Sequence, residues 1–277
     1  MINIIGRNVK DYVGKLTTEI TTYEETKDKL FMHLKNSCIS WRDGNADYFL
    51  NDINEEKLET EKVIDLLKNI KDLFDKIYLS YEVIGDELKI EETTNKLAEE
   101  MVNDCSIYCD YIIQCLSGAD ANTSSQISSI KNSLNNVKKN VVKYYNLAIS
   151  NEDSIKTAID NIEIPEIAEY SFEFTHNNAS INYVKRADME IDISNISLYM
   201  GEEENNLTVI KSLLKEIKTY YSSLNSKGID DLIEKAISNL DLMMAKRPTY
   251  KKVLDTIMEK NLEGYVQATT ILEGSEL

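Results

Sequence analysis

Helix-breaking residues are scarce in this sequence of 277 residues, which contains two prolines and nine glycines. Proline and glycine interrupt helices, and they mark the frequent turns of β sandwiches and barrels. Their scarcity leaves long uninterrupted stretches, while a hydrophobic content of 42% is enough for a packed core. The sequence therefore predicts a mainly α-helical, folded protein.

Cysteine and histidine are also few. The four cysteines are Cys38, Cys105, Cys109 and Cys115. Their number and uneven spacing do not fit a disulfide framework, so we expect reduced, buried thiols. Neither histidine, His33 or His176, lies near Cys105 and Cys109 in the sequence. We therefore expect neither a metal site nor an imidazole base for a nucleophile.

Catalytic motifs are missing as well. The sequence has no glycine-rich phosphate loop, no His-Glu-x-x-His, no Cys-x-x-Cys and no Gly-x-Ser-x-Gly. Carboxylate clusters such as Glu24-Glu25 and Glu202-Glu203-Glu204 are typical of the solvated face of a helix. We predict a non-enzymatic protein with no catalytic, cofactor-binding or metal-binding residues.

Blocks of basic residues and long apolar runs are absent from a chain whose net charge is −17. Nucleic acids bind clustered lysines and arginines, and a membrane span needs about 18 apolar residues. The N-terminus also lacks the basic and apolar regions of a cleaved signal peptide. We expect no nucleic-acid partner and no stable membrane insertion.

What the sequence does contain is a repeated helical pattern. Apolar or aromatic residues recur at alternating spacings of four and three from Val9 to Cys38, with Lys27 as the one interruption, and again from Val63 to Leu88. The same spacing returns from Leu207 to Leu224 and from Ile229 to Ile257. Short turns separate the two members of each pair, so each pair should form an antiparallel hairpin.

Gly44 and Gly228 relate the two hairpins to each other. Each glycine lies between two helical stripes, and each precedes a tyrosine, Tyr81 or Tyr265, by 37 residues. This correspondence predicts a tandem repeat of one helical hairpin. Pro248 in the second hairpin should kink the return helix or start a new segment.

Four regions follow from these patterns. Residues 1–92 form the first hairpin and residues 93–164 form connecting helices, of which the first extends the return helix of that hairpin. Residues 165–192 form a small β-rich connector, and residues 193–277 form the second hairpin. Another helical stripe runs from Ile127 to Tyr144 within the connecting helices.

The β-rich connector is predicted from alternation. Tyr170, Phe172 and Phe174 alternate with polar residues, and so do Met189, Ile191 and Ile193. Asn177-Asn178 is a suitable turn, because asparagine tolerates the left-handed conformation. We expect a small β-hairpin insertion near residues 168–193.

Trp41 is the only tryptophan and lies at the first helix-helix turn. As a structural residue it would fold over the end of the hairpin and close the core. As a functional residue it would be a partly exposed anchor for another protein.

The order of a helix, a turn containing Trp41 and Gly44, and a second helix ending near Tyr81 resembles the WXG100 (ESX-type) proteins of type VII secretion in Gram-positive bacteria. Residues 7–90 match best, although their turn reads Trp-x-x-Gly where the family has Trp-x-Gly.

Residues 193–272 match this family in length and stripe but have Asn225 where Trp41 would align. Leu224 resembles the Leu-containing turn of the related LXG proteins. The resemblance implies hairpins that pair into four-helix bundles, and export without a cleaved signal peptide. Its candidate partner contacts and second-helix tyrosines are Trp41, Gly44, Leu224, Gly228, Tyr81 and Tyr265.

The family's export signal is a tyrosine followed four positions later by Asp or Glu near the C-terminus. Tyr265 lacks this partner, whereas Tyr78 with Glu82 and Tyr48 with Asp52 have the spacing at internal positions.

The leading hypothesis is a type VII secretion-associated protein, cytoplasmic before export and then secreted, or serving as targeting partner or chaperone of a secreted toxin. Its partner would be another helical protein, such as that toxin or the secretion machinery, or a second copy of itself. An acidic, cytosolic immunity or antitoxin protein is the alternative. An α-helical pore-forming toxin is a third reading, which the charged residues within 170–193 disfavour.

Overall fold

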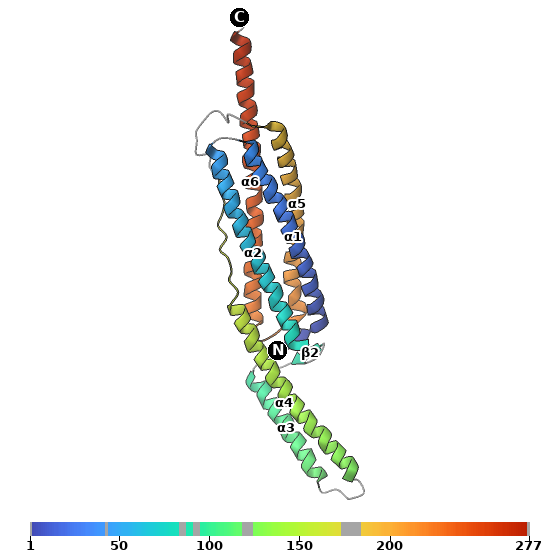
Figure 1. The fold of residues 1–277 in the computed structure, drawn as a ribbon. Coiled ribbons are helices and arrows are strands. Elements are labelled where there is room, and N and C mark those ends of the chain that lie inside the picture. Colours follow the sequence, from blue (N-terminus) through green and yellow to red (C-terminus); the bar gives the residue numbers. More distant parts are fainter. Residues whose placement is uncertain are drawn as a thin grey trace. The chain divides into compact units, whose positions relative to one another are not determined.

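Figure 1 shows a mainly α-helical chain, in a computed structural model that describes residues 2–41, 44–82, 87–90, 95–117, 124–172 and 184–275. The long helices are α1 (Gly6–Ser40), α2 (Gly44–Glu82), α3 (Asn95–Leu116), α4 (Ser124–Asp160), α5 (Arg186–Glu216) and α6 (Ser226–Ser275). The short elements are the strands β1 (Ile2–Ile5), β2 (Glu87–Ile90) and β3 (Tyr221–Ser222) and the 3-10 helix η2 (Ile217–Thr219). The predicted class, long helices in hairpins with a small β element, is confirmed.

The chain forms two compact units. Unit 1 consists of residues 1–13, 72–161 and 216–230, and unit 2 consists of residues 14–71, 162–215 and 231–277. Helices α1, α2 and α6 contribute residues to both units, so neither unit is one continuous stretch of sequence.

Unit 2 is a helical bundle in which α1, α2, α5 and α6 lie side by side (Figure 1). The apolar stripes face one another inside it, because residues three and four apart share one face of a helix. The buried core includes Leu30, Phe31, Leu34, Phe49, Ile53, Met189, Ile196, Tyr250, Leu254 and Ile257. The hairpins α1–α2 and α5–α6 thus supply two helices each to one hydrophobic core.

The turn between α1 and α2 is covered at Trp41, whose side chain has 0% of its surface exposed. Its ring packs against Phe49 with centroids 6.1 Å apart, and its backbone forms an isolated β-bridge with Val184. The backbone N–H of Lys185 donates to the carbonyl oxygen of Ser40 at 2.8 Å. The residues just before α5 are therefore tied to the end of α1.

Unit 1 contains an antiparallel sheet with the strand order β2-β1-β3. Ile4 pairs with Leu88 on one side and with Tyr221 on the other. Beside the sheet, the ring of Phe74 on α2 contacts Tyr12 on α1 and Tyr221, with centroids 5.5 and 6.5 Å apart. The sheet and these rings join the three stretches of unit 1, which are distant from one another in sequence.

Helices α3 and α4 of unit 1 form an antiparallel hairpin (Figure 1). Lys138 Nζ donates to Asp110 Oδ2 at 2.6 Å, and Lys131 Nζ donates to Ser117 Oγ at 2.9 Å. We call residues 95–116 and 124–146 the arm, with its tip at the α3–α4 connection and its base at the opposite end.

The predicted strand at Met189, Ile191 and Ile193 is wrong, because α5 already begins at Arg186. Met189 and Ile196 are buried, whereas Ile191 is 61% exposed. The residues that reach the core therefore follow the helical period, which fits this stretch as well as the alternation does.

The rest of the predicted β connector gives a mixed result. Tyr170 and Phe172 lie in a segment without regular secondary structure, and both pack on the core of unit 2. Phe174 and the turn at Asn177-Asn178 fall outside the described residues. The described sheet belongs to unit 1, which is not where the alternation indicated.

Three helix boundaries also differ from prediction. Helix α2 ends at Glu82, so Leu88 belongs to β2, and α3 is a separate helix rather than an extension of α2. Gly228 lies within α6, after the turn rather than in it. Helix α6 continues through Pro248, so of the two predicted effects, a kink or a new segment, the new segment does not occur.

Candidate functional site

The four turn residues predicted as partner contacts lie in different environments. Trp41 is buried, and no described residue accepts a hydrogen bond from its indole N–H. Gly44 is the first residue of α2. Leu224 is 38% exposed in the turn before α6. Gly228 lies in the first turn of α6, where an added Cβ would be 3.5 Å from Ile159 Cγ2. Leu224 is therefore the member of this set whose described side chain reaches the surface.

Of the two second-helix tyrosines, Tyr81 has a clear structural contact. Its side chain is buried, and its hydroxyl donates to Glu152 Oε1 at 2.6 Å. The backbone of Tyr265 belongs to α6, but its side chain lies outside the described residues.

Glu152 on α4 is the centre of a buried polar cluster in unit 1. Besides Tyr81, the hydroxyl of Tyr221 donates to its Oε1 at 3.5 Å, and Nδ2 of Asn225 donates to its Oε2 at 2.8 Å. Burial first, and then the negative Glu152, raise the pKa of both tyrosines above the ordinary value. Both hydroxyls therefore remain protonated donors that hold α4 to α2 and to β3, while Asn225 holds it to the β3–α6 connection.

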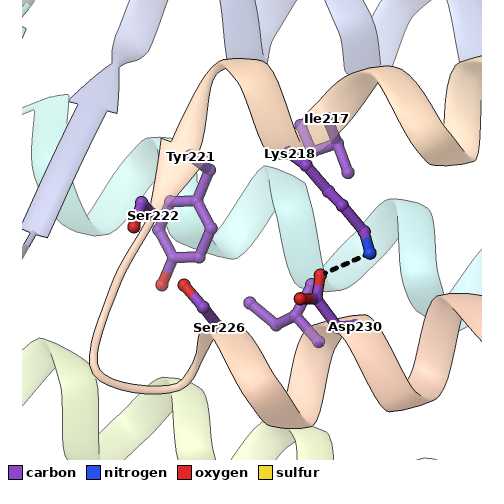
Figure 2. A pocket seen from close by; sticks show the side chains of 7 residues that line it. Ile217, Lys218, Tyr221, Ser222, Ser226 and Asp230 are labelled. Atoms are coloured by element: carbon purple, nitrogen blue, oxygen red, sulfur yellow. Dashed lines mark ion pairs between the residues drawn. The ribbon is translucent and has the colours of Figure 1, made fainter.

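Tyr221 also lines a small pocket of unit 1, which Figure 2 shows. Its volume is about 150 Å³, whereas pockets for small molecules usually have at least about 300 Å³. The charged groups at its edge, Lys218 and Asp230, already pair with each other at 3.0 Å. Its size and its paired charges make the pocket a poor substrate site.

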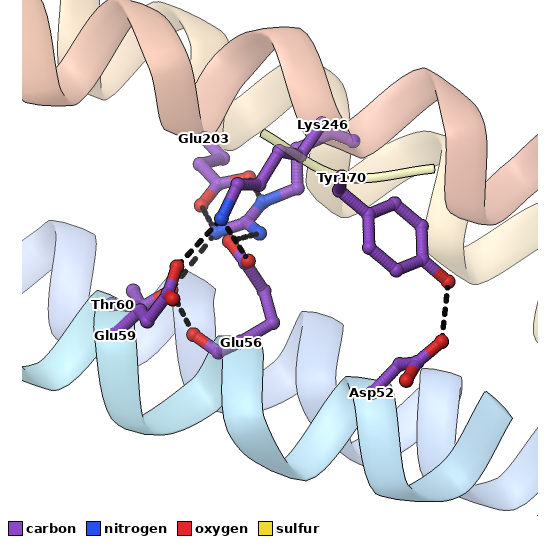
Figure 3. Close-up of polar contacts among 8 residues, drawn as sticks. Asp52, Glu56, Glu59, Thr60, Tyr170, Glu203 and Lys246 are labelled. Atoms are coloured by element: carbon purple, nitrogen blue, oxygen red, sulfur yellow. Dashed lines mark hydrogen bonds and ion pairs between the residues drawn. The ribbon is translucent and has the colours of Figure 1, made fainter. Parts of the chain in front are cut away.

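Unit 2 contains a buried ionic cluster, drawn in Figure 3. The cluster consists of Glu56, Glu59, Thr60, Glu203, Lys246 and Arg247. Arg247 on α6 donates to both carboxylate oxygens of Glu203 on α5, at 2.8 and 3.0 Å. It also donates to Glu56 and Thr60 on α2, at 2.7 and 3.2 Å. One guanidinium therefore connects three helices of the bundle.

Lys246 completes the ionic cluster by donating to Glu56 at 2.8 Å and to Glu59 at 2.6 Å. Except for Glu59, every member is 5% exposed or less. Buried charges are tolerated when they are paired and hydrogen-bonded, as they are here. Apart from Glu59, the cluster is closed to solvent, so it aligns the helices and presents little to a substrate.

Next to the ionic cluster, the segment before α5 is held by Tyr170, whose hydroxyl donates to Asp52 Oδ2 at 3.1 Å (Figure 3). Burial, followed by the nearby Asp52 carboxylate, raises the pKa of Tyr170. Its ring lies 4.4 Å from that of Tyr250, centroid to centroid. This contact positions residues 162–172 against α2 and α6.

The arm differs from all these sites because its apolar residues are exposed. On α3, Tyr108 is 67%, Tyr111 is 64% and Ile112 is 43% exposed. The apolar stripe predicted on α4 does lie on a helix, but its residues Ile130 and Val137 are 47% and 48% exposed. A pattern that usually faces a core faces solvent here.

Six of the exposed apolar residues of the arm lie on one face, whereas the exposed Ile107 and Val142 lie off it. The seam between its helices is marked by Cys109 and Asp110 on α3, and by Lys131 and Lys138 on α4. Tyr108 and Val137 each lie one position before a seam residue. Tyr111 and Ile112 follow Tyr108 by three and four residues, and Ile130 and Tyr144 lie seven residues before and after Val137. The six exposed residues are therefore Tyr108, Tyr111, Ile112, Ile130, Val137 and Tyr144. Equivalent positions on two antiparallel helices lie on the same side of the pair. We call these six residues the apolar face of the arm.

In the described ranges, no group of three or more His, Cys, Asp or Glu side chains could hold a metal ion. None of the helices in the described part of the chain combines the length and the apolarity that a membrane span requires.

Compared with known proteins, the sequence matches no family model, no curated protein and no solved structure. A functional assignment therefore rests on the hairpins and on the exposed arm.

The ionic cluster and the apolar face were both missed at the level of sequence. A signal for the cluster was present, because Glu56, Glu203 and Arg247 occupy positions that continue the four-and-three spacing of their helices. A charged residue in a core position indicates a buried partner elsewhere. No comparable signal separates an exposed apolar stripe from a buried one.

Proposed function

We propose that this chain is a non-enzymatic, type VII secretion-associated protein, which is exported itself or targets a secreted toxin through helical-bundle contacts. The observation that carries the proposal is the α1–α2 hairpin. Two helices of 35 and 39 residues are joined at Trp41 and Gly44, and the second ends just after Tyr81. This is the arrangement that the WXG100 resemblance implies.

The buried position of Trp41 changes which residues would meet a partner at this turn. Because other residues of the chain cover its ring, a partner would contact exposed neighbours of Trp41 instead. Among these, Ile39 is 61% and Tyr48 is 53% exposed. Aromatic and aliphatic side chains of this kind supply most of the binding energy in protein interfaces.

The spacing of an export signal occurs twice, and the two pairs have different surroundings. Tyr78 donates to Glu82 Oε1 at 2.7 Å in the last turn of α2, where both residues are at the surface. Asp52, the acidic member of the other pair, accepts a hydrogen bond from Tyr170. Tyr78 and Glu82 are therefore our candidates for a recognition signal.

An export assay in the native host tests this proposal. The chain should appear in the culture supernatant when the secretion ATPase is intact and remain in the cells when it is deleted. Tyr78→Ala or Glu82→Gln should reduce export at least tenfold, whereas the matched variant Asp52→Asn should not.

Affinity purification from the same host covers the targeting role. If the chain is exported poorly, it should copurify with a secreted toxin whose export depends on it. Cytoplasmic retention in both strains, with no secreted protein bound, would contradict the proposal. Recovery of a basic toxin domain, with rescue of growth, would replace it by an immunity function.

A further inference from the structure

Helices α1 and α5 lie side by side in unit 2 and run antiparallel (Figure 1). Near the end of α1, His33 Nδ1 lies 2.9 Å from Asp192 Oδ1 on α5. Seven residues earlier on α1, the hydroxyl of Thr26 accepts a hydrogen bond at 3.2 Å from Asn206, which follows Asp192 on α5. These contacts mark the seam between the two helices.

Every exposed large apolar residue on the described parts of these two helices lies on one side of the seam. The exposed fractions range from 43% to 61%, and the residues are Met32, Ile39, Ile191, Leu198 and Val209. The first four form a group in which the residues between them on the same side, Asn36 and Asn195, carry no charge. We call Met32, Ile39, Ile191 and Leu198 the outer patch.

The place of the outer patch follows from helix geometry. Met32 directly precedes His33, and Ile191 directly precedes Asp192. A residue one position before the seam lies about 100° round its helix, and on two antiparallel helices this rotation leads to the same side of the pair. The other two members follow Met32 and Ile191 by seven residues, or about two turns, so they continue the same rows.

Acidic residues border the outer patch at both ends. On α5, Asp188 and Glu202 lie on its side of the helix, 14 residues or about 21 Å apart. On α1, Glu25 precedes Met32 by seven residues and lies in the same row. None of the three carboxylates has an ion-pair partner among the described residues. The outer patch is therefore an apolar surface with unpaired negative charges at its ends.

A second copy of the chain is a poor occupant of this surface. If two outer patches stack about a two-fold axis perpendicular to the helices, α5 lies on α5 and Ile191 meets Leu198. The same rotation places Asp188 opposite Glu202, and both are negative. If the axis is parallel to the helices, α1 lies on α5 of the second copy, and Glu25 faces Glu202 at the same level of the pair. Like charges oppose each other in both arrangements, so charge disfavours self-association here.

An anionic membrane is a poor occupant as well. The chain carries a net charge of −17, and anionic lipids attract basic segments. Lys29 lies beside the outer patch, but its Nζ is over the ring of Tyr199, 5.7 Å from the centroid. The charges at the ends of the patch therefore favour a basic partner.

We propose that the outer patch binds one amphipathic helix of the secreted partner, with the apolar row of that helix along the seam and lysine or arginine at both of its ends. This inference rests on the proposed function, which supplies a helical partner. An apolar helix face that lies in a groove between two helices is a common mode of peptide recognition. Two basic residues about 14 positions apart in the partner would then face Asp188 and Glu202.

Binding of a labelled helical peptide to the full chain tests the chemistry of the occupant. The peptide has about 18 residues, leucines at spacings of three and four, and lysines at both ends. Fluorescence anisotropy should give a Kd of about 10–100 µM, because one helix buries less surface than a standard protein interface. A matched peptide with glutamates in place of the lysines should bind at least tenfold more weakly, since its ends would meet like charges.

Substitutions in the chain test the location. Leu198→Gln should weaken binding of the lysine peptide about tenfold, because it removes an apolar contact and keeps a residue that favours a helix. Leu58→Gln is the control, because Leu58 is 59% exposed on α2, outside the outer patch. Glu202→Lys should weaken the lysine peptide about threefold to tenfold and strengthen the glutamate peptide. Glu204→Lys makes the same change of charge at an exposed position on another side of α5 and should leave both unchanged. Circular dichroism checks that all four variants fold.

Several results would overturn the proposal: no binding of the lysine peptide, equal binding of both peptides, or an equal effect of Leu198→Gln and Leu58→Gln. In the native host, a photoreactive residue at position 198 should cross-link to a secreted protein, and one at position 58 should not. Cross-linking at position 198 to a second copy or to lipid would assign the outer patch to that occupant instead.

The peptide and export measurements separate this inference from the proposed function. Peptide binding with the expected variant effects, in a chain that is retained and binds no secreted protein, would contradict the proposed function alone. Export that depends on the secretion ATPase, without peptide binding, would contradict the role of the outer patch alone.

Discussion

Replacing Arg247 with methionine tests how strongly the ionic cluster stabilises unit 2. The change removes four hydrogen bonds and leaves the carboxylate of Glu203, which is 1% exposed, without its guanidinium partner. Removing one partner of a buried ion pair typically costs about 3–5 kcal/mol. Because methionine is long and apolar, little of this loss should come from a cavity. Glu56 keeps Lys246 as a partner, so most of the cost should arise at Glu203.

An exposed ion pair between the same two helices provides the control. Lys211 on α5 pairs with Asp241 on α6 at 2.7 Å, and the side chain of Asp241 is 58% exposed. Lys211→Met should therefore cost only about 0–1 kcal/mol. Glu203→Met in the Arg247→Met background should recover about 1–3 kcal/mol, because it removes the unpaired buried charge.

Urea unfolding followed by the fluorescence of Trp41 is the appropriate assay. Trp41 is the only tryptophan and is buried in the core of unit 2, so its signal reports on that unit. The midpoint should shift while the slope of free energy against urea stays constant. The reasoning is refuted if Arg247→Met costs no more than Lys211→Met, or if the second substitution brings no recovery.

Other residues give further predictions. Tyr12→Phe should change the stability of unit 1 by less than about 1 kcal/mol, because no described residue bonds its buried hydroxyl. Tyr81→Phe should cost about 1–2 kcal/mol, because it removes the hydrogen bond to Glu152. Thermal unfolding followed by circular dichroism compares the two variants. Burial raises the pKa of both tyrosines. The stability that these two tyrosines contribute is therefore complete below the pKa of an unfolded tyrosine, near 10. It should be lost as the pH rises above that value. Urea unfolding midpoints measured at increasing pH would show this loss. A thiol reagent should modify the exposed Cys115 quickly and Cys38 only on unfolding, because burial raises the pKa of the Cys38 thiol to about 12. Gly228→Ala should stabilise unit 1 by about 0.5 kcal/mol, because alanine favours a helix over glycine and the new Cβ would make an ordinary contact with Ile159. Destabilisation would show that this position requires glycine.

The arm shows where prediction from sequence stops. Its helices were predicted from the stripe of Ile127 to Tyr144 and from the helical reading of residues 93–116. Periodicity describes which side chains share a face, but it does not say whether another element covers that face. The exposure of Ile130 and Val137 follows from the absence of a described third element over them, which is a property of the tertiary arrangement.

The sequence by itself determined the helical content, the two long hairpins and the faces that carry apolar residues. These follow from local rules, because each stripe depends only on residues three and four positions apart and few residues break a helix. Tertiary structure alone decided that α2 gives way to a sheet after Glu82, where β2 pairs with β1. It also decided that Glu56, Glu203 and Arg247 meet, although 191 positions separate the first from the last. Burial of a charge is favourable only beside its partner, and the fold, rather than any local pattern, brings those partners together.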